Sequence, residues 1–206
     1  SSMMSDACGD VSSEDALCCG PGGPRLQPQL LPHGVIRATG LAGREEQRQL
    51  LEASLAVLND LPRARLLWPG VPAPVTAPAE LAQRLCARLG LRLGSLWARG
   101  YVAGGSLSFH VDPPPGGRVV LLSLGADADF AYYRPGRRHD IVELTLKSGD
   151  AVALDGGELL HAVPRVLAGP LPEFWLPDCP WARVGVQMRV REEEDGCQVG
   201  FGAKKK

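Results

Sequence analysis

Three side chains that can bind a metal ion form the most informative pattern of this sequence. One residue separates His110 from Asp112, and His161 follows farther along the chain. Two imidazoles and one carboxylate can occupy one face of an Fe(II) ion and leave the other positions open for a co-substrate and O₂. Residues i and i+2 of a β-strand point to the same side, so the His-x-Asp spacing suits the end of a strand. These three residues are the candidate metal ligands.

A His-x-Asp tripeptide alone is weak evidence for a metal site, because chance matches are common in a chain of 206 residues. His110 and His161 also fit ordinary positions in a core or on a surface. Both nevertheless follow strand-like segments, since residues 105–110 read Gly-Ser-Leu-Ser-Phe-His and the apolar run 149–157 precedes His161. The metal hypothesis therefore requires a fold that brings these two segments together.

Two arginines near the end of the chain suggest a site for a dicarboxylate. Arg183 and Arg189 stand at the two ends of the strand-like run Arg-Val-Gly-Val-Gln-Met-Arg, so they share one face by parity. A guanidinium can bind a carboxylate through two parallel hydrogen bonds, which makes arginine better suited than lysine to this role. Arg183 alone also fits an exposed surface charge, but two arginines of equal parity favour an inward-facing pair.

The elements that must position these residues begin with two helices. Apolar residues recur at helical spacing in 43–60, where Pro62 stops the pattern, and again in 79–89, which ends at Gly90. Prolines at positions 62, 69, 72, 74 and 78 indicate an irregular connection between the two helices.

Strands dominate the rest of the sequence. A short strand bounded by glycines is expected at 34–40, before the helices. Further strands are expected at 97–102, 106–111, 118–123, 128–133, 140–147, 150–154, 158–164 and 183–190. Two helices followed by about eight strands predict an α+β, mainly β fold, namely a double-stranded β-helix (jelly roll) with two N-terminal bracing helices.

Length and composition predict one folded domain. We expect a disordered leader at 1–32, which is rich in Gly, Ser and Pro, a single domain at 33–191, and a solvated tail at 192–206. A formal net charge of −1 argues against a chain that binds nucleic acid over its whole surface. The six cysteines form no C-x-x-C pair, which argues against a structural zinc site.

The sequence also bears on location and assembly. No apolar run approaches the ~20 residues that a membrane span needs, and the N-terminal residues lack the order of a secretory signal. We therefore expect no membrane partner and an intracellular protein, in the cytoplasm or the nucleus. The oligomeric state is left open by the sequence, with a monomer as the simplest expectation.

Four segments together resemble the AlkB family of Fe(II)- and 2-oxoglutarate-dependent dioxygenases. Residues 99–112 resemble the family's Asn-x-Tyr-x-x-Gly…His-x-Asp strand, and 122–125 with 129–132 are similar to its Ser-Leu-Gly…Phe segment. Residues 148–161 resemble its Gly-Asp…Gly…His stretch, and 183–189 stand where the family carries Arg-x-Asn-x-Thr-x-Arg. The resemblance covers about residues 95–191.

This resemblance implies roles for the residues that match. His110, Asp112 and His161 would bind Fe(II), and 2-oxoglutarate would chelate the same ion. Arg183 and Arg189 would bind the co-substrate, one at its distal carboxylate and the other near the metal, while the Tyr101 hydroxyl would add a hydrogen bond. Tyr101 also fits a buried core tyrosine bonded to a backbone carbonyl. Decarboxylation of 2-oxoglutarate to succinate would accompany transfer of oxygen from O₂ to a substrate C–H bond.

Departures from the family pattern lie on the substrate side. Arg99 replaces the usual Asn and adds a positive charge near the co-substrate. Gly185 and Gln187 replace Asn and Thr in the final motif. Pro114 stands where family members that repair alkylated bases often carry an acidic residue, and the region that would cover the substrate is short. These departures bear on the substrate, while the metal and co-substrate residues are retained.

The sequence leaves three functions open. The first is oxidative demethylation of N-alkylated bases in DNA or RNA, which the family favours, with the target base flipped or single-stranded. The second is action on a protein side chain or a small molecule, and the third is a non-catalytic scaffold, which an intact ligand set argues against. The candidate substrate residues of a basic groove are Arg99, Arg118, Arg134, Arg137 and Arg138, with Trp68 as a possible stacking partner. The four tryptophans also fit plain packing roles.

Overall fold

The computed structural model describes residues 26–58, 63–67, 77–114 and 116–191. Within these ranges the chain forms two α-helices, α1 (Arg44–Leu58) and α2 (Ala77–Ala87), two short 3-10 helices and eleven strands. The strands are β1 (Gln27–Leu30), β2 (Ile36–Thr39), β3 (Arg63–Leu67), β4 (Leu93–Tyr101), β5 (Leu107–His110), β6 (Arg118–Gly125), β7 (Ala128–Tyr133), β8 (Val142–Leu146), β9 (Ala151–Asp155), β10 (Leu160–Val166) and β11 (Arg183–Val190).

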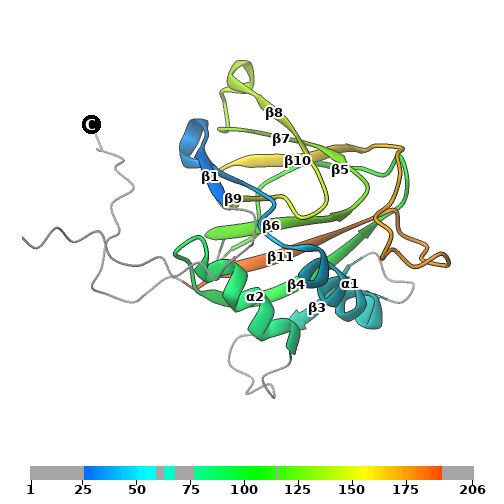
Figure 1. Ribbon diagram of the computed structural model, residues 1–206. Helices are drawn as coiled ribbons and strands as arrows, with labels where there is room; N and C mark the ends of the chain where they lie inside the picture. The colour runs from blue at the N-terminus through cyan, green and yellow to red at the C-terminus, as the bar shows by residue number, and fades with distance from the viewer. Residues whose placement is uncertain (1–25, 59–62, 68–76, 115, 192–206) are drawn as a thin grey trace, which may run out of the picture.

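The strands form two antiparallel sheets that face each other. The major sheet has seven strands in the order β1-β2-β9-β6-β11-β4-β3, and the minor sheet has four in the order β5-β10-β7-β8. Figure 1 shows the two helices on the outer side of the major sheet and the minor sheet on its other side. This arrangement is the predicted double-stranded β-helix with two bracing helices, so the fold prediction is confirmed.

Two hydrophobic clusters hold the layers together. One cluster lies between α1, α2 and the outer face of the major sheet, where Leu50 and Leu81 are fully buried against Leu96 and Val186 of the strands. The other lies between the two sheets and includes Tyr132 and Phe130 of β7. Burial of each such side chain stabilises the fold by roughly 1.5–3 kcal/mol relative to exposure. The two clusters alternate residue by residue along β6 and β9, so every second side chain of the major sheet faces the space between the sheets.

Two strands were not expected. The strand β1 lies within the range predicted as leader, so folded structure begins before residue 33, and β3 lies in the predicted irregular connection. Both are edge strands of the major sheet, where one neighbour suffices and a proline such as Pro28 is tolerated. Backbone pairing to β2 and to β4 forms these strands without an apolar pattern of their own.

Other expectations on the chain ends remain predictions. Residues 1–25 and 192–206, which hold most of the predicted leader and nearly all of the predicted tail, lie outside the described residues. In the part of the chain that is described, no helix has both the length and the apolar character needed to cross a membrane.

Candidate metal centre

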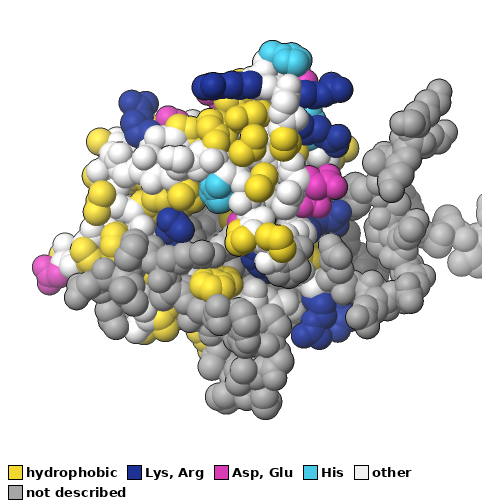
Figure 2. Space-filling model, turned by 180° about the vertical axis from the view of Figure 1, so that it is seen from behind, with side chains coloured by type: hydrophobic (Ala, Val, Ile, Leu, Met, Phe, Trp, Pro, Cys, Tyr) yellow, Lys and Arg dark blue, Asp and Glu magenta, His cyan; other side chains and the backbone are white. Residues whose placement is uncertain are grey.

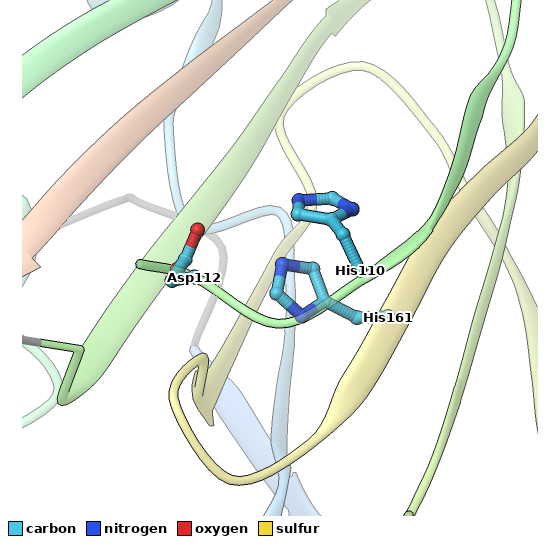
Figure 3. Close-up of side chains that lie close together, drawn as sticks. All are labelled: His110, Asp112 and His161. Atoms are coloured by element: carbon cyan, nitrogen blue, oxygen red, sulfur yellow. The ribbon is translucent and has the colours of Figure 1, made fainter. Parts of the chain in front are cut away.

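The two sheet strands β5 and β10 bring the predicted metal ligands together. His110 is the last residue of β5 and is the direct cross-strand partner of His161, near the start of β10. Asp112 follows two residues after β5, and one ligand atom from each of the three residues lies within 4.8 Å of the others. Figure 3 shows both imidazole rings extending from their strands towards Asp112. The fold therefore brings together the two segments, one ending at His110 and one leading to His161, as the metal hypothesis required.

Backbone carbonyls fix the orientation of both imidazole rings. The Nδ1 atom of His110 lies 2.8 Å from the carbonyl oxygen of Ser108, and Nδ1 of His161 lies 2.9 Å from that of Leu159. A carbonyl oxygen can only accept, so each Nδ1 carries the proton and donates. Both Nε2 atoms are then left with a free lone pair, which is the form that binds a metal ion.

The carboxylate of Asp112 is held on one side and unpartnered on the other. Its Oδ1 lies 3.0 Å from Nη2 of Arg189, whereas its Oδ2 is buried without a hydrogen-bond partner in the described part of the chain. The backbone N–H of Asp112 donates to the carbonyl oxygen of Gly156 at 2.7 Å. Burying a carboxylate oxygen without a partner costs free energy, and a bound cation at this oxygen would remove that cost.

Burial keeps His161 in the neutral form. The ring is 3% exposed, and this burial lowers the pKa of His161 from its usual value of 6.5. The hydrogen bond to Leu159 and the charge of Asp112 oppose the shift, while the nearby His110 supports it. Because the pKa stays below its usual value, the ring is unprotonated at neutral pH and available to a metal ion.

These donors fit Fe(II). Two neutral imidazoles and one carboxylate meet on one side of a common point, as in a facial triad that leaves other positions open. The unpartnered Oδ2 of Asp112 and the two Nε2 atoms are the ligand atoms that would hold the ion. A structural zinc site would instead use four protein ligands, and no fourth His, Cys, Asp or Glu belongs to this group among the described residues.

Arg183 is a buried guanidinium without an acidic partner. Its side chain is 3% exposed, its Nε donates to the Ser123 hydroxyl at 3.1 Å, and its guanidinium carbon lies 5.1 Å from the centre of the Tyr101 ring. Burial lowers the pKa of Arg183, but an arginine remains charged at neutral pH. No ion pair found among the described residues involves this group. A buried, unpaired cation is costly and fits a site that receives an anion.

The two arginines on β11 therefore have different surroundings. Arg183 contacts Ser123 and Tyr101 at one end of the strand, and Arg189 contacts Asp112 and the carbonyl oxygen of Gly116 at the other. The predicted pair does share the face that looks into the space between the sheets. Arg189 pairs with a candidate metal ligand, whereas Arg183 has no acidic partner among the described residues.

The structure divides the remaining predicted residues into separate groups. Arg99 is half-buried on β4, directly opposite Gly185 of β11, and Arg118 is exposed at the start of β6. Arg134, Arg137 and Arg138 lie together in the exposed connection between β7 and β8. The five arginines thus do not form one continuous groove across a single sheet. Trp68 lies outside the described residues.

Two residues of the site were missed in the sequence. Ser123, which accepts a hydrogen bond from Arg183, is fully buried in β6. The sequence feature that could have identified it is its place in the segment 122–125, which resembles the family's Ser-Leu-Gly segment. Gly156 lies against Asp112, and the sequence feature that could have identified it is the Gly-Gly pair shortly before His161. An ideal Cβ at Gly156 would lie about 2 Å from Oδ2 of Asp112, so only glycine fits there.

Replacing Gly156 by alanine should therefore displace the Asp112 carboxylate. We expect Gly156→Ala to weaken metal binding roughly 10- to 100-fold, as changes around metal ligands commonly do. The measurement is a titration of the metal-free variant with Co(II), followed by visible absorption. Gly169→Ala is the matched control, because a Cβ at Gly169 meets nothing within 4 Å. Unchanged Co(II) affinity in Gly156→Ala would show that Asp112 is not a ligand.

Comparison with known proteins agrees with this geometry. No family model and no curated protein matches the sequence. Among solved structures, the chain is similar to the structure of OsALKBH1, with 16% identity, a TM-score of 0.57, and coverage of 80% of this chain and 100% of the other. It is also similar to an oxidoreductase of the 2OG-Fe(II) oxygenase family from Burkholderia pseudomallei, with 12% identity, a TM-score of 0.53, and coverage of 75% and 83%. The chain has the double-stranded β-helix fold of these proteins.

Proposed function

We propose that this chain is an Fe(II)- and 2-oxoglutarate-dependent oxygenase that removes alkyl groups from N-alkylated bases in DNA or RNA. The observation that carries the oxygenase part is the combination of the His110, Asp112 and His161 cluster with the buried, unpaired Arg183. The cluster fits a divalent metal ion, and Arg183 fits the far carboxylate of a diacid. Both groups face the same space between the two sheets of the shared fold.

Each residue has a defined task in this proposal. Fe(II), when bound together with 2-oxoglutarate and O₂, supplies the oxidation of an unactivated C–H bond. His110 and His161 would hold the ion through Nε2, because their Nδ1 atoms donate to backbone carbonyls. Asp112 would hold it through the carboxylate oxygen that does not contact Arg189, and Arg189 keeps that carboxylate in place.

The co-substrate is oriented by the other end of β11. Arg183 binds the distal carboxylate of 2-oxoglutarate, and the Tyr101 ring lies against this guanidinium. Ser123 accepts a hydrogen bond from Arg183 Nε, so the contact that fixes the guanidinium does not use its terminal nitrogens. Such a bidentate contact selects a diacid of matching length over a monoacid. Arg99, opposite Gly185, adds positive charge beside this position.

The proposal for the substrate rests on charge near the metal. Arg134, Arg137 and Arg138 form an exposed basic loop after β7, whose residue Tyr132 pairs with His161. Positive charge at the end of the sheet that bears the metal ligands fits a phosphate backbone. Hydroxylation of an alkyl carbon attached to a ring nitrogen gives a product that breaks down to the free base and an aldehyde. The target base must leave a duplex or come from a single strand to reach the site.

One observation favours a second candidate, a protein side chain or a small molecule as the substrate. Pro113 and Pro114 follow Asp112 and are exposed, so no side chain there can donate to or accept from a base edge. A site that reads a base by hydrogen bonds would need such groups from elsewhere. This candidate keeps the same metal and co-substrate residues.

The experiment is incubation with N-methylated DNA and RNA oligonucleotides, Fe(II) and 2-oxoglutarate, followed by mass analysis of the bases. We expect loss of one methyl group and release of formaldehyde, in step with succinate. Succinate formation without loss of methyl from any oligonucleotide would reject nucleic acid as the substrate and leave the oxygenase. Absence of any succinate would reject the oxygenase as well.

A further inference from the structure

The outer face of the minor sheet carries two aromatic rings beside the metal ligands. Phe109 of β5 and Tyr133 of β7 are half-buried, and their rings meet edge to face with centroids 5.0 Å apart. Their chain neighbours His110 and Tyr132 face the space between the sheets. Successive strand residues point to opposite faces, so Phe109 and Tyr133 face outward.

Three arginines follow Tyr133 within five residues of the chain. Arg134, Arg137 and Arg138 are all exposed in the connection between β7 and β8. The one acidic residue of this connection is Asp140, which lies 3.9 Å from Arg137 and 3.2 Å from His139. Among the described residues, Arg134 and Arg138 form no ion pair. We call Phe109, Tyr133, Arg134, Arg137 and Arg138 the aromatic–arginine surface.

This surface lies at the metal end of the minor sheet. Tyr132 pairs with His161, which in turn pairs with His110, so the three strands end or begin at the same level. Arg134 is two residues farther along than Tyr132, which places its Cα roughly 7 Å beyond the level of the metal ligands. In the upper part of Figure 2, where the minor sheet lies, hydrophobic side chains are exposed between Lys and Arg side chains.

We propose that the aromatic–arginine surface binds the strand of a single-stranded nucleic acid next to the target base. The identity of the partner rests on the proposed function, whereas the location of the surface does not. Guanidiniums without acidic partners suit successive phosphates, and an outward aromatic ring suits the face of an unpaired base. An acidic peptide would match the arginines but would gain nothing from the rings. A duplex would keep its base faces stacked and out of reach.

The limits of the surface are set by acidic side chains. Glu143 of β8 is exposed and is the cross-strand partner of Ala131, two residues before Tyr133. Asp129, near the start of β7 and so farther from the surface, forms an ion pair with Arg165 at 3.6 Å. The nucleic-acid strand should therefore cross the end of the minor sheet near Tyr133 and the arginines that follow it, and should not run along the length of the sheet.

The test measures binding by the metal-free chain, so its result is separate from that of the turnover assay. The probe is a fluorescein-labelled single-stranded oligonucleotide of about 16 nucleotides, as DNA and as RNA, followed by anisotropy at several salt concentrations. We expect Arg134→Glu/Arg138→Glu to weaken binding at least about 10-fold and to lower the salt slope by roughly 1.4, or about 0.7 for each phosphate contact on a single strand. Glu143→Gln should strengthen binding.

Two further variants separate stacking from charge. Tyr133→Leu should weaken binding of the single strand roughly 5- to 100-fold, and Tyr133→Phe should restore it, because a base stacks on either ring. Arg44→Glu/Arg84→Glu is the charge-matched control, since both arginines are exposed on the helices across the major sheet from this surface. Unfolding midpoints equal to that of the wild type will show that each variant is folded.

Three results would overturn the proposal. The first is no binding by the wild type, and the second is equal weakening by the control pair on the helices. The third is a loss of binding in the arginine variant but none in Tyr133→Leu, together with equal competition by a polyglutamate peptide. That third result would assign the surface to polyanions in general and not to nucleic acid.

Discussion

Replacing His110 by alanine should abolish the Fe(II)-dependent conversion of 2-oxoglutarate to succinate. The variant loses one of three candidate ligand atoms that lie within 4.8 Å of one another, so only His161 and Asp112 remain to hold an ion. Changes to residues around metal ligands already cost roughly 10- to 100-fold, so loss of a ligand should cost at least the upper end of that range. Asp112→Ala should have the same effect.

The matched control for this prediction is another histidine of the same chain. His139 is exposed, lies in the connection between β7 and β8, and has its Nε2 atom 3.2 Å from Oδ1 of Asp140. His139→Ala should therefore leave succinate formation in the absence of a prime substrate unchanged. If His110→Ala retained wild-type turnover while folded, the assignment of the metal ligands would be wrong.

Replacing Arg183 by methionine should raise the concentration of 2-oxoglutarate that half-saturates turnover roughly 10- to 150-fold. Hydrogen bonds to a charged group contribute about 1.5–3 kcal/mol, and the diacid would lose the one arginine that is buried among the described residues. Methionine fills a similar volume without charge. The effect should fall on this half-saturating concentration more than on the limiting rate, because Arg183 binds an end of the co-substrate that does not react.

The same variant makes a second measurement possible. A buried guanidinium without an acidic partner destabilises the ligand-free protein, so Arg183→Met should keep or raise the unfolding midpoint of the free chain. Addition of 2-oxoglutarate with a non-oxidisable metal such as Co(II) should stabilise the wild type far more than the variant, since only the state that binds ligand is stabilised. Equal stabilisation of both would show that Arg183 does not bind the co-substrate. Arg84→Met, at an exposed position of α2, is the control.

Local pattern was sufficient to predict the fold class and the cluster of metal-binding side chains. The apolar run before His161 is strong because its strand, β9, lies between β2 and β6 and buries most of its side chains. The strand before His110, β5, is an edge strand of the minor sheet, and its signal was the alternation of apolar and polar residues that ends at the His-x-Asp tripeptide. Helical spacing identified α1 and α2 to within a few residues, since each buries one leucine-rich face on the major sheet. Parity alone correctly placed Arg183 and Arg189 on one face of β11.

Contacts that depend on register could not be read from local pattern. The edge strands β1 and β3 carry no apolar alternation, because backbone pairing with one neighbour forms them. The close approach of Gly156 to Asp112 arises from the packing of two loops distant in sequence. The different surroundings of Arg183 and Arg189 likewise depend on Ser123 and Asp112, which the sequence places far from β11. The positions of the candidate groove arginines were also hidden from local pattern, because Arg99 and Arg118 lie on strands of the major sheet and Arg134, Arg137 and Arg138 in the connection between β7 and β8.

The most direct test of the account is a titration of the metal-free wild-type chain with Co(II), first alone and then with 2-oxoglutarate. The account predicts one bound ion per chain, a change in its visible spectrum when 2-oxoglutarate joins it, and loss of both signals in His110→Ala. No bound ion in the wild type, or an unchanged spectrum and stoichiometry in His110→Ala, would contradict it.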